Sequence, residues 1–228
     1  GATVSLVDMN IEAGEQQAQT LGAQAEFVKL DVTDEQAAEQ FFKDVLAKHG
    51  AVYGLVNCAG IGPSAKVVGK ESVHDLAMFS KTLHINVTGT FNMLRFAADA
   101  MSKNIVAEGD EDRGVIVNTA SVAAFDGQIG QAAYSASKGA VVAMTLPIAR
   151  ELARHQIRVL TIAPGIMETP MLKGLPQNVQ DALGQMVPYP SRLGRPEEFA
   201  RLVAHIAENS YLNGEVIRLD GGIRMAAK

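Results

Sequence analysis

Short runs of Val, Ile and Leu alternate along the chain with longer segments in which apolar residues recur every three or four positions. Buried parallel strands give such apolar runs, and connecting helices give the longer period. The alternation therefore predicts an α/β fold, with a doubly wound parallel sheet covered by helices on both faces, in a single domain over residues 1–228. The predicted strands are Thr3–Val7, Glu26–Leu30, Gly54–Asn57, Gly114–Asn118, Ile157–Ala163 and Glu215–Leu219.

Helices are predicted between these strands. Thr33 opens a capping box with Gln36, and apolar residues follow on one stripe, so a helix is expected to begin there. The segment 166–192 contains four prolines around a short helical pattern, and an excursion of this length after a strand predicts a substrate-binding lid. The other predicted helices are Ile11–Leu21, Val73–Met101, Ala132–Arg154 and Pro196–Glu208.

Charge and composition argue against several partners. The net charge is −5 and basic residues form no long run, so the chain lacks the positive surface that nucleic-acid binding needs. No run of 18 apolar residues predicts a membrane span. The single cysteine, Cys58, is expected to be a small buried apolar group, and no metal site is predicted. We expect a cytoplasmic protein, or one of the mitochondrial matrix if a preceding segment carries a targeting signal.

The stretch Ser121–Lys138 carries the residues best suited to chemistry. Tyr134 and Lys138 are four positions apart, so on a helix they share one face. A nearby ammonium lowers the pKa of a phenol toward a range useful for acid and base catalysis. Ser121 supplies a hydroxyl that can bind a substrate oxygen. The alternative is that Tyr134 is an ordinary helix-surface residue and Lys138 a solvated charge.

Residues at the ends of three predicted strands suit a dinucleotide in a Rossmann-like fold. Asp8 ends the first strand, where its carboxylate can accept hydrogen bonds from both ribose hydroxyls and would repel a 2′-phosphate, so NAD is favoured over NADP. Asp31 and Val32 end the second and could touch adenine, although an aspartate there could instead cap the next helix. The third ends in Asn57-Cys58-Ala59-Gly60, whose small side chains allow close approach of a ligand.

The glycine-rich turn that usually holds the pyrophosphate is absent from the sequence. In the usual doubly wound order, the strand before that turn lies beside the strand predicted at Thr3–Val7. We therefore expect that one strand-turn-helix unit, about 30 residues long, precedes Gly1.

The order Asn57-Cys58-Ala59-Gly60, Asn86, Ser121, Tyr134, Lys138 and Pro164-Gly165 resembles the short-chain dehydrogenase/reductase family over nearly the whole chain. The resemblance implies that Tyr134 acts as general acid in reduction and as base in oxidation. Ser121 would hold and polarise the reacting oxygen. Lys138 would lower the pKa of Tyr134 and bind the nicotinamide ribose.

Further roles follow only from this resemblance. Asn86 would hold a water that links Lys138 to solvent, whereas its alternative role is that of a helix-internal residue that bends the helix. Pro164, Gly165 and Thr169 would contact the cofactor, with Thr169 at the nicotinamide carboxamide. Gln128 either touches substrate or is a plain loop residue, and His84 is expected to be structural.

The implied activity is hydride transfer between NAD and a secondary alcohol or ketone. Long strings around Tyr134, Pro164 and the last strand resemble in particular members that act on the 3-hydroxy group of an acyl-CoA. A steroid or generic alcohol dehydrogenase is the alternative, since substrate choice would depend on the loops 61–73 and 167–192. A non-catalytic NAD-binding scaffold is the alternative from another class. A serine hydrolase is disfavoured because no G-x-S-x-G motif occurs.

The resemblance also implies a homotetramer. Contacts would involve the helices near Val87–Met101 and Ala132–Arg154, together with the last strand. Small side chains on these helices would allow close packing between subunits, and they are Ala97, Ala98, Ala100, Ala140 and Ala143.

Overall fold

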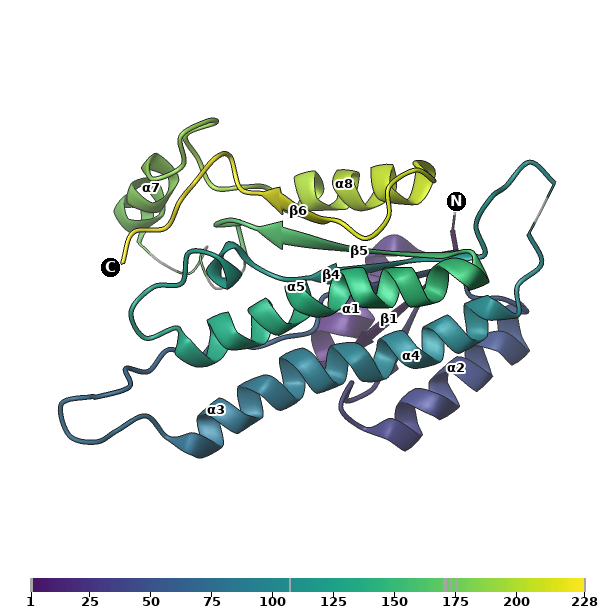
Figure 1. The fold of residues 1–228 in the computed structure, drawn as a ribbon, viewed down its shortest axis with the longest axis horizontal. Coiled ribbons are helices and arrows are strands. Elements are labelled where there is room, and N and C mark those ends of the chain that lie inside the picture. The colour runs from purple at the N-terminus through teal and green to yellow at the C-terminus, as the bar shows by residue number, and fades with distance from the viewer. Residues whose placement is uncertain (1, 107, 170–171, 173, 175, 228) are drawn as a thin grey trace.

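The computed structural model describes residues 2–106, 108–169, 172, 174 and 176–227 and shows an α/β molecule (Figure 1). All pairs of neighbouring strands in this part of the chain are parallel, which confirms the predicted class. The strands form one sheet in the order β1-β2 and a second in the order β3-β4-β5-β6. Their bounds are β1 Val4–Asp8, β2 Ala25–Lys29, β3 Gly54–Asn57, β4 Gly114–Thr119, β5 Ile157–Pro164 and β6 Val216–Leu219.

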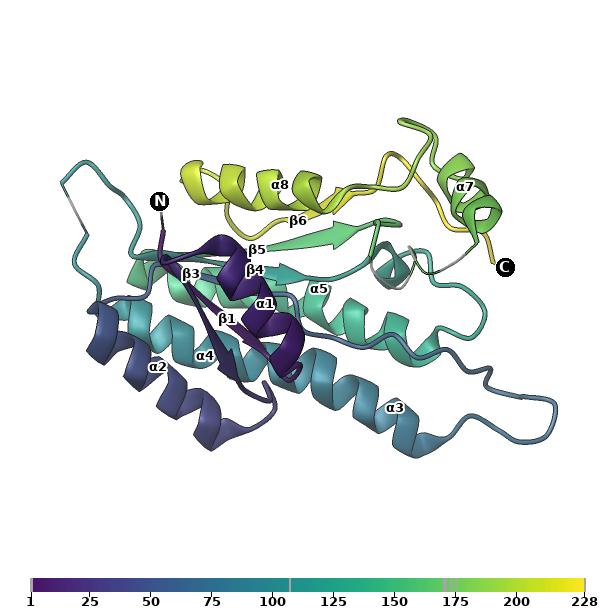
Figure 2. The same cartoon turned by 180° about the vertical axis from the view of Figure 1, so that it is seen from behind.

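The helices cover both faces of the four-stranded sheet. In Figure 1, α4 and α5 lie on one side of β4 and β5, and α8 lies on the other. Figure 2 shows α1 lying over the β1–β2 pair. The bounds are α1 Ile11–Leu21, α2 Glu35–His49, α3 Leu76–Leu83, α4 Thr90–Ser102, α5 Ala132–Leu152, α7 Gln177–Gln185 and α8 Pro196–Glu208. A π-helical turn, His84–Gly89, joins α3 to α4.

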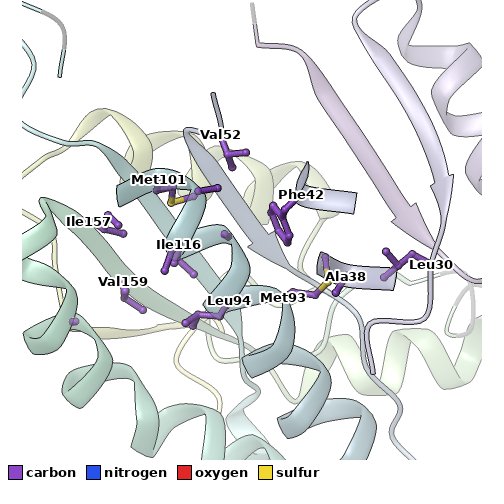
Figure 3. Close-up of a cluster of buried hydrophobic side chains, with 14 residues drawn as sticks. Leu30, Ala38, Phe42, Val52, Met93, Leu94, Met101, Ile116, Ile157 and Val159 are labelled. Carbon is purple, nitrogen blue, oxygen red and sulfur yellow. The ribbon is translucent and has the colours of Figure 1, made fainter. Parts of the chain in front are cut away.

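The strands β4 and β5 are buried on both faces because alternate side chains of a strand point to opposite sides. On one face, Leu160 packs with Ile206 of α8. On the other, Ile116 and Val159 belong to the cluster that contains Leu94 of α4 (Figure 3). The middle of this sheet is therefore an ordinary close-packed core.

The strands β1, β2 and β3 are more exposed. No residue of β1 or β2 is fully buried, and Asn57 is the one buried residue of β3. Val56 of β3 has 43% of its surface exposed. Among the described strands, none pairs with the second edge of β1 or of β3. The backbone groups on these two edges therefore make no ladder hydrogen bonds within the described part of the chain.

Two helices begin later than predicted, each behind an aspartate. Asp34 caps α2 by accepting a hydrogen bond from the Ala37 amide at 2.9 Å, so the predicted capping box at Thr33 is wrong. Asp75 caps α3, and Val73, the predicted start, lies instead in an antiparallel bridge. Aspartate is among the best capping residues. In both cases it lies inside the segment that the apolar pattern had assigned to the helix, and the helix begins after it.

Arg158 anchors the amino-terminal end of β5. Its side chain is 6% exposed and donates to Asp112 Oδ2 at 2.5 Å. The same guanidinium donates to the carbonyl oxygens of Ile206 at 2.8 Å and of Leu212 at 3.1 Å, near the end of α8. A buried arginine with this many partners holds β5 and α8 together. It does so at the amino-terminal end of β5, away from the carboxyl ends of the strands.

Candidate active site

The predicted site residues gather at the carboxyl edge of the four-stranded sheet. Asn57 is the last residue of β3 and pairs in register with Asn118 of β4. Ser121 follows β4 by two residues, and Pro164 ends β5. Parallel strands bring their carboxyl ends to one edge, which is where open α/β sheets bind ligands.

Ser121 is held in place by local structure. It precedes a short 3-10 helix, Val122–Ala124, and its Oγ accepts a hydrogen bond from the Ala123 amide at 3.1 Å. The residue is 9% exposed, and its side chain lies close enough to the Tyr134 phenol to lower the pKa of that phenol. The two predicted hydroxyls are therefore neighbours.

Burial raises the pKa of the Tyr134 phenol above its usual value of 10.0, against the opposing effect of the hydrogen bond to Ser121. The predicted lowering of this pKa by Lys138 is therefore wrong for the chain as the structure describes it. Lys138 Nζ lies 5.8 Å from the Tyr134 ring centroid and donates to the Thr119 carbonyl oxygen at 2.7 Å. Burial lowers the pKa of Lys138 itself to about 8. Sequence spacing placed the two groups together but could not show how strongly both are desolvated.

Asn86 lies fully buried in the π-helical turn. Its Nδ2 donates to the Ile61 carbonyl at 2.8 Å and to Ser137 Oγ at 2.9 Å, while its Oδ1 accepts from the Ile61 amide at 2.8 Å. Both amide hydrogens are thus used by protein atoms. A water at Asn86 would have to bind an oxygen of this residue. Ser137, which sequence reasoning missed, completes the link by donating to the Tyr134 carbonyl at 2.7 Å.

Gly60 lies close to the side chains of Asn86 and Lys138. A Cβ at this position would lie 3.1 Å from Asn86 Oδ1 and 3.5 Å from Lys138 Nζ. A side chain here would therefore crowd two of the groups on which the predicted chemistry depends. Ala59 and Gly60 are exposed, in line with the predicted close approach of a ligand.

Asn57 takes a structural position instead of facing outward. Its Nδ2 donates to Asn118 Oδ1 at 2.9 Å and to the Thr90 carbonyl at 3.3 Å, which joins β3, β4 and α4. Asn118 Nδ2 is buried and has no hydrogen-bond partner among the described residues. The neighbouring Cys58 is exposed, so its predicted burial is wrong, although enclosure of the thiol still raises its pKa.

The two acidic residues predicted for the cofactor differ in how they are engaged. Asp8 is exposed at the end of β1, and its Oδ1 accepts from the Asn10 amide at 2.8 Å. Asp31 accepts from the Thr33 amide at 2.9 Å and from the Thr33 hydroxyl at 2.8 Å, and the first of these bonds is the main reason that the pKa of Asp31 is lowered. Asp31 stabilises the turn before α2, while Asp34 caps that helix.

Val32 and His84 lie beside this turn. The Val32 carbonyl accepts from Asn92 Nδ2 at 2.9 Å, and its side chain fills the space that a Cβ on Gly89 would need. His84 is exposed at the start of the π-helical turn, and its nearness to Asp31 contributes to the lowered pKa of that carboxyl.

The predicted lid is fixed at its base. Met167 and Gly194 form a parallel bridge, and the Glu168 amide donates to the Gly194 carbonyl at 2.7 Å. Thr169 donates its amide to the Met167 carbonyl at 2.8 Å. Within the lid, α7 is described, whereas residues 170, 171, 173 and 175 lie outside the described residues. Gly165 donates its amide to Leu219 of β6 at 2.9 Å.

Gln128 is bound to the carboxyl-terminal segment. Its Nε2 donates to the Ala226 carbonyl at 3.1 Å, and the Ile129 amide donates to the Ala227 carbonyl at 3.0 Å. Sequence reasoning gave no sign that the end of the chain returns to the loop before Tyr134, since no local pattern encodes a contact over about a hundred residues.

A cavity of about 390 Å³ lies between the loop after β3 and α3, lined by Ile61, Pro63, Asp75, Ala77, Met78 and Lys81. Another of about 320 Å³ lies between β2 and α2, away from Tyr134. In the part of the chain that the structure describes, no helix has the length and apolar character needed to cross a membrane. Nor do the described His, Cys, Asp and Glu side chains form a group able to hold a metal ion.

Comparisons with known proteins agree with this geometry. A family profile described as enoyl-(acyl carrier protein) reductase matches residues 1–224. The chain is 52% identical over 227 residues to 3-hydroxyacyl-CoA dehydrogenase type-2 of Homo sapiens, covering 99% of this chain and 87% of that protein. It is 35% identical to the 3-oxoacyl-[acyl-carrier-protein] reductase FabG of Thermotoga maritima, covering 98% and 88%.

The fold agrees as well. The crystal structure of 3-hydroxyacyl-CoA dehydrogenase type-2 from Mycobacterium avium matches with a TM-score of 0.94 at 37% identity, over 100% of this chain and 88% of that one. The chain therefore belongs to the short-chain dehydrogenase/reductase family and is an oxidoreductase that depends on a nicotinamide cofactor.

Proposed function

We propose that the protein transfers hydride between NAD and the 3-hydroxy carbon of a 3-hydroxyacyl-CoA, which becomes a 3-oxoacyl-CoA. The observation that carries this proposal is the cluster of Ser121, Tyr134 and Lys138 at the carboxyl edge of the sheet. The Ser121 side chain lies beside the Tyr134 phenol, and Lys138 Nζ lies 5.8 Å from the Tyr134 ring centroid. The acyl-CoA is proposed as substrate because relatives named 3-hydroxyacyl-CoA dehydrogenase type-2 are 50–52% identical over 99% of the chain.

The two hydroxyls divide the work at the reacting oxygen. In reduction, Tyr134 gives its phenolic proton to the carbonyl oxygen while Ser121 donates a hydrogen bond to the same atom. In oxidation, the phenolate takes the hydroxyl proton. Because burial raises the pKa of Tyr134, the phenol is mostly protonated at neutral pH, which suits reduction. The rate of oxidation is expected to rise with pH through the neutral and mildly alkaline range.

Lys138 and Asn86 serve this proton transfer. Among the described residues, the Lys138 ammonium makes one hydrogen bond, to Thr119, and this leaves N–H groups for the hydroxyls of a ribose. With a pKa of about 8, Lys138 can also pass a proton near neutral pH. Asn86 fixes the Ile61 backbone beside Lys138, and an oxygen of Asn86 would hold the water that leads to solvent.

The residues present fit a nicotinamide dinucleotide. The absence of a side chain at Gly60 keeps the space above Asn86 and Lys138 open. Asp8 is exposed with one carboxylate oxygen engaged by a backbone amide, so the other can accept from a ribose hydroxyl. Its charge would repel a 2′-phosphate, and for this reason we propose NAD over NADP. When bound, NAD supplies the hydride acceptor.

Other contacts to the cofactor are proposed by position. Val32 and Asp31 lie at the end of β2, on the side where adenine would bind, although the Asp31 carboxylate is already used by Thr33. Pro164 and Gly165 at the end of β5 would form the wall beside the nicotinamide, and Thr169 would reach its carboxamide. Ala59 and Asn57 would line the approach, Asn57 through its backbone because its side chain bonds to Asn118.

The substrate would enter from the side of the two long loops. The cavity of about 390 Å³ includes Ile61 and Pro63 of the loop after β3, and Ile61 is bonded to Asn86. This cavity is therefore the proposed entrance for the acyl chain, with residues 166–192 as its lid. Gln128 would contact substrate only if its bond to Ala226 opened.

The substrate class is tested by comparing two ketones. Acetoacetyl-CoA should support NADH oxidation at a kcat/KM at least about tenfold above that of a 17-ketosteroid. The reverse order would reject the acyl-CoA and favour a steroid dehydrogenase. Tyr134→Phe should lower kcat by about 10²–10⁴-fold with either substrate, and unchanged turnover would mean that the proposed chemistry is wrong. A chain that turns over neither ketone would be a cofactor-binding scaffold.

We also propose a homotetramer, with a correction to the predicted contacts. Ala97, Ala98 and Ala100 are buried within the subunit, so they cannot form the surface between subunits. Exposed apolar residues on the same two helices, Phe91 at 46% and Leu146 at 44%, are better candidates. The exposed Ala143 and the partly exposed Ala140 lie on α5 as well. Light scattering on a protein of residues 1–228 should give four times the chain mass of 24.2 kDa.

A further inference from the structure

A cluster of opposite charges lies between β6 and the loop 121–134. Arg218 of β6 donates through Nη2 to Asp126 Oδ2 at 2.6 Å and through Nε to Asp220 Oδ2 at 2.7 Å. Its guanidinium carbon is 5.2 Å from the centroid of the Phe125 ring. The side chains of Arg218 and Asp126 are only 21% and 20% exposed, and that of Asp220 is 8% exposed. These bonds are therefore well shielded from water.

Asp126 is joined closely to Ser121. The Ser121 hydroxyl accepts from the Ala123 amide, and the Asp126 amide donates to the Val122 carbonyl at 2.9 Å. The segment from Ser121 to Asp126 is thus one compact hydrogen-bonded turn. A displacement of the Asp126 carboxylate would be transmitted to the Ser121 hydroxyl, because the turn has little freedom to absorb it.

Arg218 reaches the second half of the same loop through the end of the chain. Its Nη2 donates to the Ile223 carbonyl at 3.0 Å. The segment after Ile223 accepts hydrogen bonds from the Ile129 amide, through Ala227, and from the side chain of Gln128. One guanidinium therefore connects to both halves of the loop that carries Ser121 at its start and leads into α5 at its end.

A third connection runs to the wall at the end of β5. Asp220, which Arg218 holds, packs so closely on Gly165 that a Cβ there would lie 2.9 Å from Asp220 Cα. Gly165 is also bonded to Leu219, the neighbour of Arg218. The Arg218 side chain is thus connected both to the proposed nicotinamide wall and to the turn that begins at Ser121.

We propose that Arg218 is a positioning residue that sets the Ser121 hydroxyl against the Pro164-Gly165 wall by holding Asp126 and Asp220 at once. The inference rests on the proposed function, in which Ser121 binds the reacting oxygen. Arg218 acts on turnover through the position of Ser121 relative to this wall, because Arg218 is given no contact with the reacting oxygen. Misplacement of a reacting group by about 1 Å can cost a factor of about a hundred.

The test compares two arginine-to-lysine changes. Arg218→Lys keeps the charge but cannot span Asp126 and Asp220, so kcat for acetoacetyl-CoA reduction should fall about tenfold while KM for NADH stays within about twofold. Arg158→Lys is the matched control, because Arg158 is also a shielded arginine with an aspartate partner but lies at the opposite end of β5. It should lower the thermal midpoint and leave kcat within about twofold of the unchanged protein.

A second variant approaches the cluster from the loop. Asp126→Ala should lower kcat to about the same extent. The double variant with Arg218→Lys should be no slower than either alone, since both break the same Arg218–Asp126 contact. The proposal is overturned if both single variants keep kcat within about twofold, if the two effects add in full, or if Arg158→Lys lowers kcat equally.

The test separates this inference from the proposed function. Should the unchanged protein reduce a different ketone and not acetoacetyl-CoA, the proposed substrate is wrong, and the same kcat ratios measured with the accepted ketone still decide the role of Arg218. Should Tyr134→Phe remain fully active, the site itself is wrong. In that case, retained effects of Arg218→Lys could not be assigned to Ser121, and the inference falls with the site.

Discussion

The four-stranded sheet and the two-stranded sheet differ sharply in how they are built. Seven of the eight residues of β5 are buried, whereas none of the residues of β1 or β2 is. The residues Ser121, Tyr134 and Lys138 lie around the four-stranded sheet. In the two-stranded sheet, Asp8 ends β1 and Asp31 follows β2. The groups proposed to act on the reacting oxygen therefore lie on the better-packed region, and those proposed to bind the adenosine end of the cofactor lie on the more exposed one.

The difference in burial between the two sheets also holds for the charged residues of the site. Lys138 is 5% exposed and carries one hydrogen bond to protein among the described residues, so the dense packing that positions it also destabilises its charge. Asp8 is exposed, so its charge stays hydrated. Substitutions at the two positions should therefore affect activity and stability in different proportions.

The largest effect is expected for Lys138→Met. Without the ammonium, kcat should fall at least about a hundredfold. Because burial lowers the pKa of Lys138 from 10.5 to about 8, the folded protein binds fewer protons than the unfolded chain between pH 8 and 10.5, and stability rises with pH over this window. Methionine removes the buried charge, so the thermal midpoint at about pH 7 should stay equal or rise. A large fall in that midpoint would contradict the argument.

A pair of leucines tests the packing difference directly. Leu160→Ala, in fully buried β5, should lower the free energy of unfolding by about 2–5 kcal/mol. Leu6→Ala, in half-buried β1, should lower it by less than about 2 kcal/mol. Urea unfolding followed by circular dichroism measures both. Equal losses would mean that β1 packs as firmly as β5.

The proposed cofactor contact predicts a smaller change. Asp8→Asn keeps the oxygen that caps the Asn10 amide but removes the charge, so KM for NAD should rise about tenfold. Discrimination against NADP should weaken by a similar factor, since the repulsion of a 2′-phosphate is lost. Steady-state kinetics with both cofactors decides this, and an unchanged ratio of kcat/KM values would place the ribose elsewhere.

The smallest effect concerns acid stability. Hydrogen bonds from Lys48 and Ser5 lower the pKa of Glu26 from 4.5 to about 2, so its contribution is present above pH 4.5 and is lost as pH falls toward 2. Glu26→Gln should flatten this decline. Glu198, whose pKa is also about 2 owing mainly to Arg192, is the matched control at the lid base. Hydrogen exchange should show the effect of Glu26→Gln in β1, β2 and the end of α2, and faster exchange at the lid base instead would contradict the assignment.

Much of the fold was predictable because it is encoded locally. The bounds of α8 were predicted as Pro196–Glu208 and confirmed, since proline and two acidic residues mark its start. The strand β3 was confirmed as Gly54–Asn57. The predicted start of α3 was wrong because apolar residues also occur before Asp75, where Val68 and Val73 form a bridge and no helix. A pattern of apolar residues cannot tell a helix from an exposed apolar turn.

The site was predictable in membership more than in energetics. The spacing of Tyr134 and Lys138 predicted that the two side chains are neighbours, and Lys138 Nζ lies 5.8 Å from the Tyr134 ring centroid. The raised pKa of Tyr134 depends on burial, which the spacing does not show. Ser137, Asn118 and Arg218 were missed because each acts through partners more than 50 positions away. Such contacts arise only after the chain has folded, and no short motif records them.

The π-helical turn at His84–Gly89 makes the number of residues between α3 and α4 important for the position of Asn86. Each residue of an α-helix adds about 100° of rotation, and a π turn accommodates one extra residue without breaking the helix. Deleting a single residue between 84 and 89 would restore a regular α-helix and remove the bulge that presents Asn86, while α3 and α4 keep their faces. Asn86 would leave Ile61 and Ser137 although its own identity was unchanged. In this segment a one-residue deletion would therefore disturb the site while leaving the two flanking helices in place.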